Sequence, residues 1–235
     1  RRSFKATRPI VLGGIEASLR RIAHFDYWSD SIRRSILFDA KADALIYGMG
    51  ERAVLELAQA LAQGGDFREI RGLCYIAHAP RPDYLTLPDF ETVAADQEAF
   101  TGMFRLFYDN NDPVTARGLN QQHGDRWLVQ NPPALHLSEA ELDQAAELPF
   151  EREQHPWHQQ FGAVRALDTI RFSINTHRGC YGECHFCAIA VHQGRTVLSR
   201  SEASILREAE ELTRHPAFRG IISDAGGPTA NMYGF

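Results

Sequence analysis

The feature that most constrains this chain is a group of three cysteines, Cys180, Cys184 and Cys187, with the spacing C-x3-C-x2-C. The residues from Ile170 to Asn175 alternate between apolar and polar, which predicts a β-strand directly before the group. Three thiols on a short loop that contains glycine can converge on one point. Iron–sulfur clusters are held by Cys thiolates, usually four of them. The spacing therefore predicts a cluster in which one iron has no protein ligand, as a cofactor or substrate that coordinates there requires.

Two other interpretations of the same loop stay open. The three cysteines with His185, His177 or His192 would make a Cys₃His zinc site in a binding module without catalysis. A closed cluster that only transfers electrons is the other alternative, although it needs a fourth ligand. The remaining cysteine, Cys74, lies in an apolar segment and is expected to be a small buried hydrophobe. Because no second C-x2-4-C pair exists, the cluster is favoured over zinc.

The composition excludes several classes of protein. Of the 235 residues, 44% are hydrophobic and 23% charged, which is typical of a globular protein. No apolar run approaches the roughly 20 residues that span a bilayer, so we expect a cytoplasmic protein without a membrane partner. A net charge of −5 gives no general attraction to nucleic acid. The basic pairs Arg20–Arg21 and Arg33–Arg34 are expected on solvated helix faces.

Strand and helix signals alternate along the first part of the chain. Short apolar runs end at Gly13-Gly14 and at Gly48-Met49-Gly50, and residues 51–63 have helical spacing. This alternation predicts an α/β fold with a parallel sheet covered by helices. Residues from Pro80 to about Trp157 are rich in Pro, Asp, Asn and Gln, which indicates a connector. Within it, Ser138 and Glu141 fit a capping box. After the cysteine loop, Ser199 or Ser201 is expected to cap a helix that runs to about His215.

The cysteine loop, with Phe186 beside its third cysteine, looks like the radical S-adenosylmethionine (radical SAM) motif. This resemblance implies a 4Fe–4S cluster held by Cys180, Cys184 and Cys187, whose fourth iron binds S-adenosylmethionine. One electron then cleaves that cofactor into methionine and a 5′-deoxyadenosyl radical. The turn Gly226-Gly227-Pro228 is similar to the glycine-rich turn of that family that contacts the cofactor's methionine part, although Pro228 replaces an acidic residue. Phe186, Gly226, Gly227 and Pro228 are therefore expected to contact the cofactor.

The amino-acid sequences of longer segments are similar to those of one branch of these proteins. His177-Arg178-Gly179-Cys180, Gly13 to Arg21 and the stretch from Gly226 to Gly234 resemble the YgiQ-type (UPF0313) radical SAM proteins. Members of that branch are much longer, so we expect the chain to be a fragment that lacks both ends of the full-length protein. The resemblance implies no substrate. It does imply an electron donor such as a flavodoxin or a ferredoxin.

The resemblance also predicts how the domains are arranged. Residues 1–79 would form a partial Rossmann-like domain, similar to the cobalamin-binding domain that precedes many radical SAM barrels. Cobalamin is possible but unsupported, because the lower-axial Asp-x-His-x-x-Gly motif is absent from these residues and its usual position would be in the part expected to be missing. A structural domain without a cofactor is the alternative. Residues 80–164 would be a connector with short helices. Residues 165–235 would form the first strand–helix–strand unit of a radical SAM (β/α) barrel.

Overall fold

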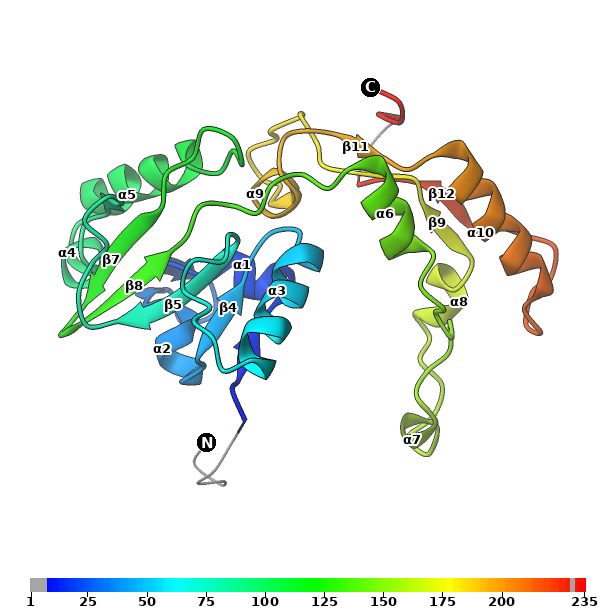
Figure 1. Cartoon of the computed structure of the whole chain (residues 1–235), viewed down its shortest axis with the longest axis horizontal. Coiled ribbons are helices and arrows are strands. Elements are labelled where there is room, and N and C mark those ends of the chain that lie inside the picture. The colour runs from blue at the N-terminus through cyan, green and yellow to red at the C-terminus, as the bar shows by residue number, and fades with distance from the viewer. Residues whose placement is uncertain (1–7, 229–230) are drawn as a thin grey trace. The chain divides into compact units, whose positions relative to one another are not determined.

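The computed structural model of the chain describes residues 8–228 and 231–235 (Figure 1). Thr229 and Ala230, which belong to the glycine-rich motif, lie outside the described residues. The contacts divide the chain into two compact units. The first unit consists of the chain up to Leu135 together with Cys184–Gly194, and the second consists of His136–Glu183 and Arg195–Phe235.

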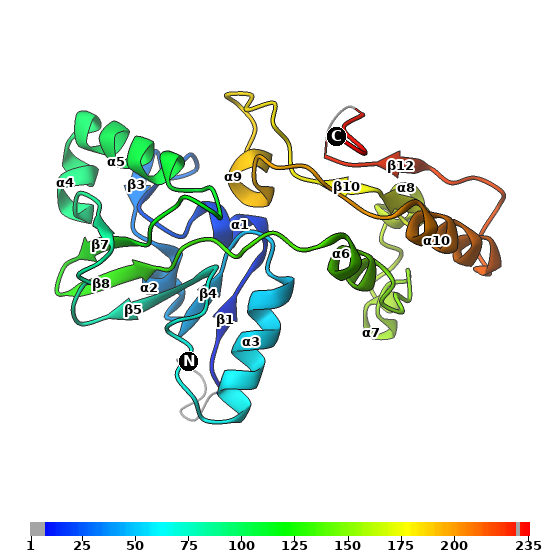
Figure 2. The same cartoon turned by 45° about the horizontal axis from the view of Figure 1, so that its top comes forward.

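The first unit is built around a sheet with helices on both faces. Its strands are β1 (Val11–Leu12), β2 (His24–Asp26), β3 (Ser31–Arg33), β4 (Ala44–Ile46), β5 (Leu73–Ala77), β6 (Leu85–Thr86), β7 (Leu119–His123) and β8 (Arg126–Gln130). Its helices are α1 (Gly14–Leu19), α2 (Ile36–Ala40), α3 (Glu51–Ala62), α4 (Phe90–Ala95), α5 (Gln97–Asp109) and α9 (Ile189–Gln193). Six strands form the main sheet in the order β1-β4-β5-β8-β7-β6, and β2 and β3 form a separate hairpin (Figure 2).

The predicted α/β fold is confirmed, but the main sheet is mixed rather than parallel. β1 runs parallel to β4, whereas β5 runs antiparallel to β4, with Ile46 of β4 opposite Leu73 of β5. The cause is the stretch of ten residues between the end of α3 and β5. Ten extended residues can span about 33 Å, whereas α3 is about 18 Å long at 1.5 Å per residue. The segment can therefore run back along α3, so that β5 begins at the edge of the sheet where β4 ends. The backbone N of Tyr47 then donates to the carbonyl of Gly72 at 2.9 Å.

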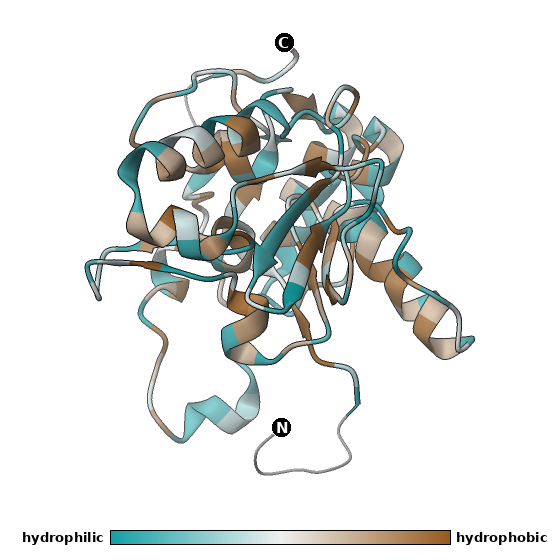
Figure 3. Ribbon diagram, turned by 90° about the vertical axis from the view of Figure 1, so that its left-hand side faces the viewer, coloured by the Kyte–Doolittle hydropathy of each residue, from teal (hydrophilic) through white to brown (hydrophobic). Residues whose placement is uncertain are grey.

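Each face of the sheet buries its own apolar cluster, because successive strand residues point to opposite faces. Leu45, Cys74 and Leu128 face one cluster, which α1, α2, α4 and α5 complete. Ile46, Tyr75 and Val129 face the other cluster, which α3 covers through Ala53 and Leu57. The helices carry both hydrophobic and hydrophilic residues in Figure 3, as expected of helices that cover a sheet on one side. Cys74 is fully buried, as predicted.

The second unit contains a short parallel strand pair and the helix that connects it. Its strands are β9 (Ser173–Asn175), β10 (His177–Arg178), β11 (Leu198–Ser199) and β12 (Asp224–Gly226). Its helices are α6 (Glu139–Ala146), α7 (Pro156–Gln159), α8 (Leu167–Ile170) and α10 (Glu202–Arg214). β9 and β12 pair in parallel, and α10 lies between them in sequence, so the predicted strand–helix–strand unit is present. β9 begins later than expected because residues 167–170 form α8.

Helix capping in the second unit follows the sequence closely. Ser138 and Glu141 form the predicted capping box at the start of α6, and the hydroxyl of Ser201 caps α10 by accepting from the backbone N of Ser204. Such caps satisfy backbone N–H groups that a helix start would otherwise leave without partners.

The two units divide the chain at other positions than the expected limits at residues 79 and 164. Residues 85–130, expected in the connector, supply β6, β7 and β8 to the sheet of the first unit. The domain limits of the whole fold stay a prediction. Among the described helices, none has both the length and the apolar character that crossing a membrane requires.

Candidate cofactor site

In the second unit, the cysteine loop follows the carboxyl end of β9. The backbone N of Thr176 donates to the carbonyl of Gly226 at 2.7 Å and extends the pairing of β9 with β12. The chain then pairs through β10 with β11 before it reaches Gly179, whose φ is +85°. A Cβ at Gly179 would lie 2.0 Å from the carbonyl oxygen of Thr196. Both the positive φ and the missing space require glycine directly before Cys180.

The glycine-rich turn leaves the neighbouring strand at the same end. Asn175 of β9 and Gly226 of β12 are in register, so Cys180 and Gly227 both follow the carboxyl ends of adjacent parallel strands. In open α/β sheets, ligands bind outside these ends. A cavity of about 590 Å³ opens here within the second unit. Its lining residues are Thr176, His177, Glu202, Ile205, Leu206, Asp224, Ala225, Gly226, Gly227, Asn231 and Tyr233.

His177 forms part of the wall of this cavity and packs against Gly227. Its Nδ1 lies 2.9 Å from the hydroxyl of Thr176, and its buried Nε2 has no hydrogen-bond partner within the described part of the chain. A Cβ on Gly227 would lie only 2.3 Å from Nε2. Burial lowers the pKa of His177, which favours the neutral imidazole. The imidazole and the glycine turn therefore fit together only because residue 227 has no side chain.

The three predicted cluster ligands fall into different units. Cys180 is buried in the second unit, where its Sγ accepts from the backbone N of Gly182 at 3.3 Å. The exposed Cys184 and the half-buried Cys187 belong to the first unit, and the N of Cys187 donates to the carbonyl of Cys184 at 2.9 Å. Over residues 8–228 and 231–235, no three His, Cys, Asp or Glu side chains are gathered as ligands of one metal ion.

The chemistry of the donor set nevertheless fits the predicted cluster. Thiolates are the ligands of iron–sulfur clusters, and the three cysteines lie within one loop. Of the predicted cofactor contacts, Gly226 and Gly227 line the cavity, whereas Pro228 is not among its lining residues. Phe186 is 92% exposed. The roles of these residues stay predictions.

Two of the histidines proposed as zinc ligands make other contacts. His177 packs against Gly227, as described above. The Nδ1 of His192 lies 3.0 Å from the hydroxyl of Ser18 in the first unit. Both hydrogen bonds involve Nδ1, and a metal-binding imidazole commonly makes such a bond with the nitrogen that does not coordinate. The Cys₃His site therefore stays an open alternative.

One basic pair has a different role from the one expected. Arg33 and Arg34 are indeed at the surface, where both pair with Asp39. Arg21, in contrast, is fully buried in the first unit. Its burial corrects the expectation of a solvated face, and its partners come from distant parts of the chain, which no local pattern reveals.

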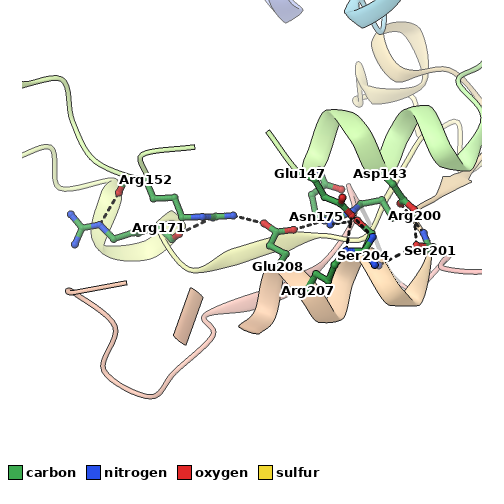
Figure 4. A network of polar contacts seen from close by, with 10 residues as sticks. All are labelled: Asp143, Glu147, Arg152, Arg171, Asn175, Arg200, Ser201, Ser204, Arg207 and Glu208. Atoms are coloured by element: carbon green, nitrogen blue, oxygen red, sulfur yellow. Dashed lines mark hydrogen bonds and ion pairs between the residues drawn. The ribbon is translucent and has the colours of Figure 1, made fainter. Parts of the chain in front are cut away.

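A second buried polar network supports β9 in the second unit (Figure 4). Arg200 donates to the carbonyl of Asn175 at 2.9 Å and to the hydroxyl of Ser204 at 2.8 Å, and it forms an ion pair with Glu208. Glu208 also pairs with Arg152. The network thereby joins α10 to the strand end that precedes the cysteine loop. Only the Ser201 cap was visible in the sequence.

Comparison with known proteins gives matches over the whole chain. The family model described as "Radical SAM N-terminal" matches residues 1–173. A UPF0313 protein of Fusobacterium nucleatum is 55% identical over 235 residues, which are 100% of this chain and 41% of that protein. A UPF0313 protein of Geobacter sulfurreducens is 52% identical over 96% of this chain and 38% of that protein. The chain thus spans about two fifths of the length of these relatives.

Solved structures give a more distant match. The radical S-adenosylmethionine methyltransferase TsrM from Kitasatospora setae has a TM-score of 0.45 and 20% sequence identity to this chain. The match covers 87% of this chain and 27% of that enzyme.

Proposed function

Because this chain belongs to the Radical SAM N-terminal family, we propose that the full-length protein is a radical SAM enzyme that cleaves S-adenosylmethionine reductively. The predicted resemblance to the UPF0313 proteins is confirmed by the relatives described above. The substrate from which the enzyme takes a hydrogen atom is not identified by this resemblance.

The observation that carries the proposal is the parallel pairing of β9 with β12. With this pairing, the loop that contains Cys180 and the turn at Gly226-Gly227 both follow the carboxyl ends of adjacent strands in the second unit. In the proposal, the first element supplies thiolate ligands, and the second supplies a backbone that a ligand can approach closely. The cavity that Gly226 and Gly227 line has room for part of a small organic cofactor.

In this proposal Cys180, Cys184 and Cys187 hold three irons of a 4Fe–4S cluster. When bound, the cluster supplies the electron that breaks the sulfonium bond of S-adenosylmethionine to give methionine and a 5′-deoxyadenosyl radical. The backbone of Gly226 and Gly227 accepts hydrogen bonds from the amino group of the cofactor's methionine part. His177 keeps the turn in place, and Phe186 would contact the bound cofactor.

The experiment uses the full-length protein, reconstituted anaerobically with iron and sulfide. With S-adenosylmethionine and a reductant we expect release of 5′-deoxyadenosine, and Cys184→Ala should release none. Loss of the product in the variant without loss of bound iron would contradict the ligand assignment. Stoichiometric zinc after both aerobic and anaerobic purification, with no uptake of iron, would favour the zinc-stabilised binding module instead.

The electron donor that we propose is a flavodoxin or ferredoxin in the cytoplasm. Dithionite replaces it in the assay.

A further inference from the structure

The segment that carries Cys184 and Cys187 is anchored to the first unit by its following helix. α9 begins two residues after Cys187, and Val191 packs against the apolar cluster that also contains Leu45 and Cys74. The carbonyl of Ala190 accepts from the backbone N of Gly194 at 3.1 Å, and the last carbonyls of a short helix need further donors. The side chain of Asn111 reaches these groups, with Nδ2 at 3.3 Å from the carbonyl oxygen of Ala190 and at 3.1 Å from that of Val191.

Arg21 sets the orientation of the Asn111 amide. Its NH2 group donates to Oδ1 of Asn111 at 3.1 Å, which directs the amide nitrogen towards α9. Arg21 is itself fixed, because its Nε donates to Oε1 of Gln130 at 3.0 Å and its guanidinium lies 4.3 Å from the ring centroids of both Tyr47 and Phe107. A fully buried guanidinium in this setting has no freedom to turn away.

Ser18 provides a second anchor for the same helix. Its hydroxyl lies 3.0 Å from Nδ1 of His192 and accepts from the backbone N of Gly48, also at 3.0 Å. Ser18 is fully buried, and its carbonyl accepts from NH1 of Arg21. The two anchors therefore belong to one connected network that starts from Arg21.

We propose that Asn111, oriented by Arg21 and assisted by Ser18, is a positioning residue that holds α9 and thereby the loop with Cys184 and Cys187 in its cluster-binding conformation. The inference rests on the proposed function for the cluster, but the anchoring of α9 can be measured without it. The N-terminal sheet then has a specific task, since it fixes the segment that carries Cys184 and Cys187.

Asn111→Asp separates this role from a general contribution to folding. Aspartate keeps an acceptor for Arg21 but has no N–H to donate to Ala190 and Val191. Asn110→Asp is the matched control, because the neighbouring Asn110 donates only to the carbonyl of Leu106 in its own helix, at 2.8 Å. Ser18→Ala removes the second anchor with little change in volume.

The first measurement is amide hydrogen exchange of the full-length protein without iron. Asn111→Asp should speed exchange in residues 188–194 on the order of 5- to 30-fold, the effect of losing one or two hydrogen bonds. Exchange in β4 and β5 should stay unchanged, as in the control. Acceleration spread over the whole sheet would show that Asn111 merely supports the fold and would overturn the assignment.

The second measurement is the rate at which a chelator removes iron from the reconstituted protein. Asn111→Asp and Ser18→Ala should each lose iron several-fold faster than the wild type and Asn110→Asp. Equal rates in all four proteins, together with unchanged exchange in α9, would refute the inference. If the wild type takes up no iron at all, the proposed function fails, and hydrogen exchange alone then decides whether Asn111 anchors α9.

Discussion

His177 and Gly227 are in contact at the mouth of the candidate site, and the space for a Cβ at residue 227 is already filled by the imidazole. The distance from that Cβ position to Nε2 of His177 would be 2.3 Å, and those to Cε1 and Cδ2 would be 2.4 and 2.5 Å. β9 and β12 bring the two residues together, although 50 positions separate them in the sequence.

We expect Gly227→Ala to force this turn away from His177. Overpacking of this kind costs about 1–3 kcal/mol in unfolding free energy, and binding of S-adenosylmethionine should weaken as well. Replacing His177 by Ala in the same protein should restore most of the binding, because it empties the space. Chemical denaturation and cofactor titration of both variants test this. Gly226→Ala is the control for a methyl group that has room, since the atom nearest to a Cβ at residue 226 would be 3.8 Å away. A Gly227→Ala protein that behaves as the wild type does would show that the contact is loose.

The residue before the first cysteine should be equally sensitive. Gly179→Ala meets a positive φ of +85° and a carbonyl oxygen 2.0 Å away, and neither can be relieved by a rotamer change. We expect a loss of cluster content after reconstitution, measured as iron and sulfide per chain. Gly220→Ala controls for the cost of a side chain at positive φ alone, because Gly220 has a φ of +84° and a Cβ there would have no atom within 4 Å. Equal iron content in the two variants would contradict the role given to the Thr196 contact.

The buried ion pairs of Glu208 should matter more for stability than those at the surface. The side chain of Arg200 is 3% exposed and that of Glu208 is 10% exposed. Glu208→Gln leaves two arginines without their carboxylate, which we expect to cost about 3–5 kcal/mol. Glu210→Gln on the same helix breaks only a surface contact of 3.9 Å with Arg214, and about 0–1 kcal/mol is expected. Urea denaturation of both variants compares the two costs, and similar values would contradict this account of the network.

His123 should make the stability of the first unit depend on pH. Its ring lies between Phe38 and Phe90, and burial, with a smaller effect of Arg34, lowers its pKa from 6.5 to about 4. Between these values the unfolded chain binds a proton that the folded chain does not. The free energy of unfolding should therefore fall as the pH drops from about 6.5 to about 4, by up to about 3 kcal/mol from this residue. His123→Phe should flatten that part of the pH profile in denaturation experiments, and an unchanged slope would assign the effect to other groups.

Local signals in the sequence predicted local structure well. The capping box of Ser138 and Glu141 and the cap at Ser201 were visible because each depends on residues three positions apart. The burial of Arg21 was not, because its partners Asn111 and Gln130 lie 90 and 109 residues further along the chain. The direction of β5 was also missed, since the path of a loop after a helix leaves no periodic signal.

In the candidate site, too, short local motifs could be predicted from the sequence, whereas contacts between distant residues could not. The cysteine spacing and the glycine turn predicted candidate ligands and the end of a strand from short motifs. The contact of His177 with Gly227 depends on the register of β9 with β12, which single-sequence patterns do not contain. The anchoring of α9 by Asn111 depends on the packing of the first unit and was likewise invisible.

The central claim is that three cysteines leave one iron of the cluster open for S-adenosylmethionine. The most direct test is electron paramagnetic resonance of the reduced, reconstituted full-length protein, recorded with and without S-adenosylmethionine. The account predicts a change in the g values of the cluster signal on addition of the cofactor, and no cluster signal at all in Cys180→Ala. An identical signal with and without the cofactor would mean that S-adenosylmethionine does not coordinate the cluster, and the claim would be wrong.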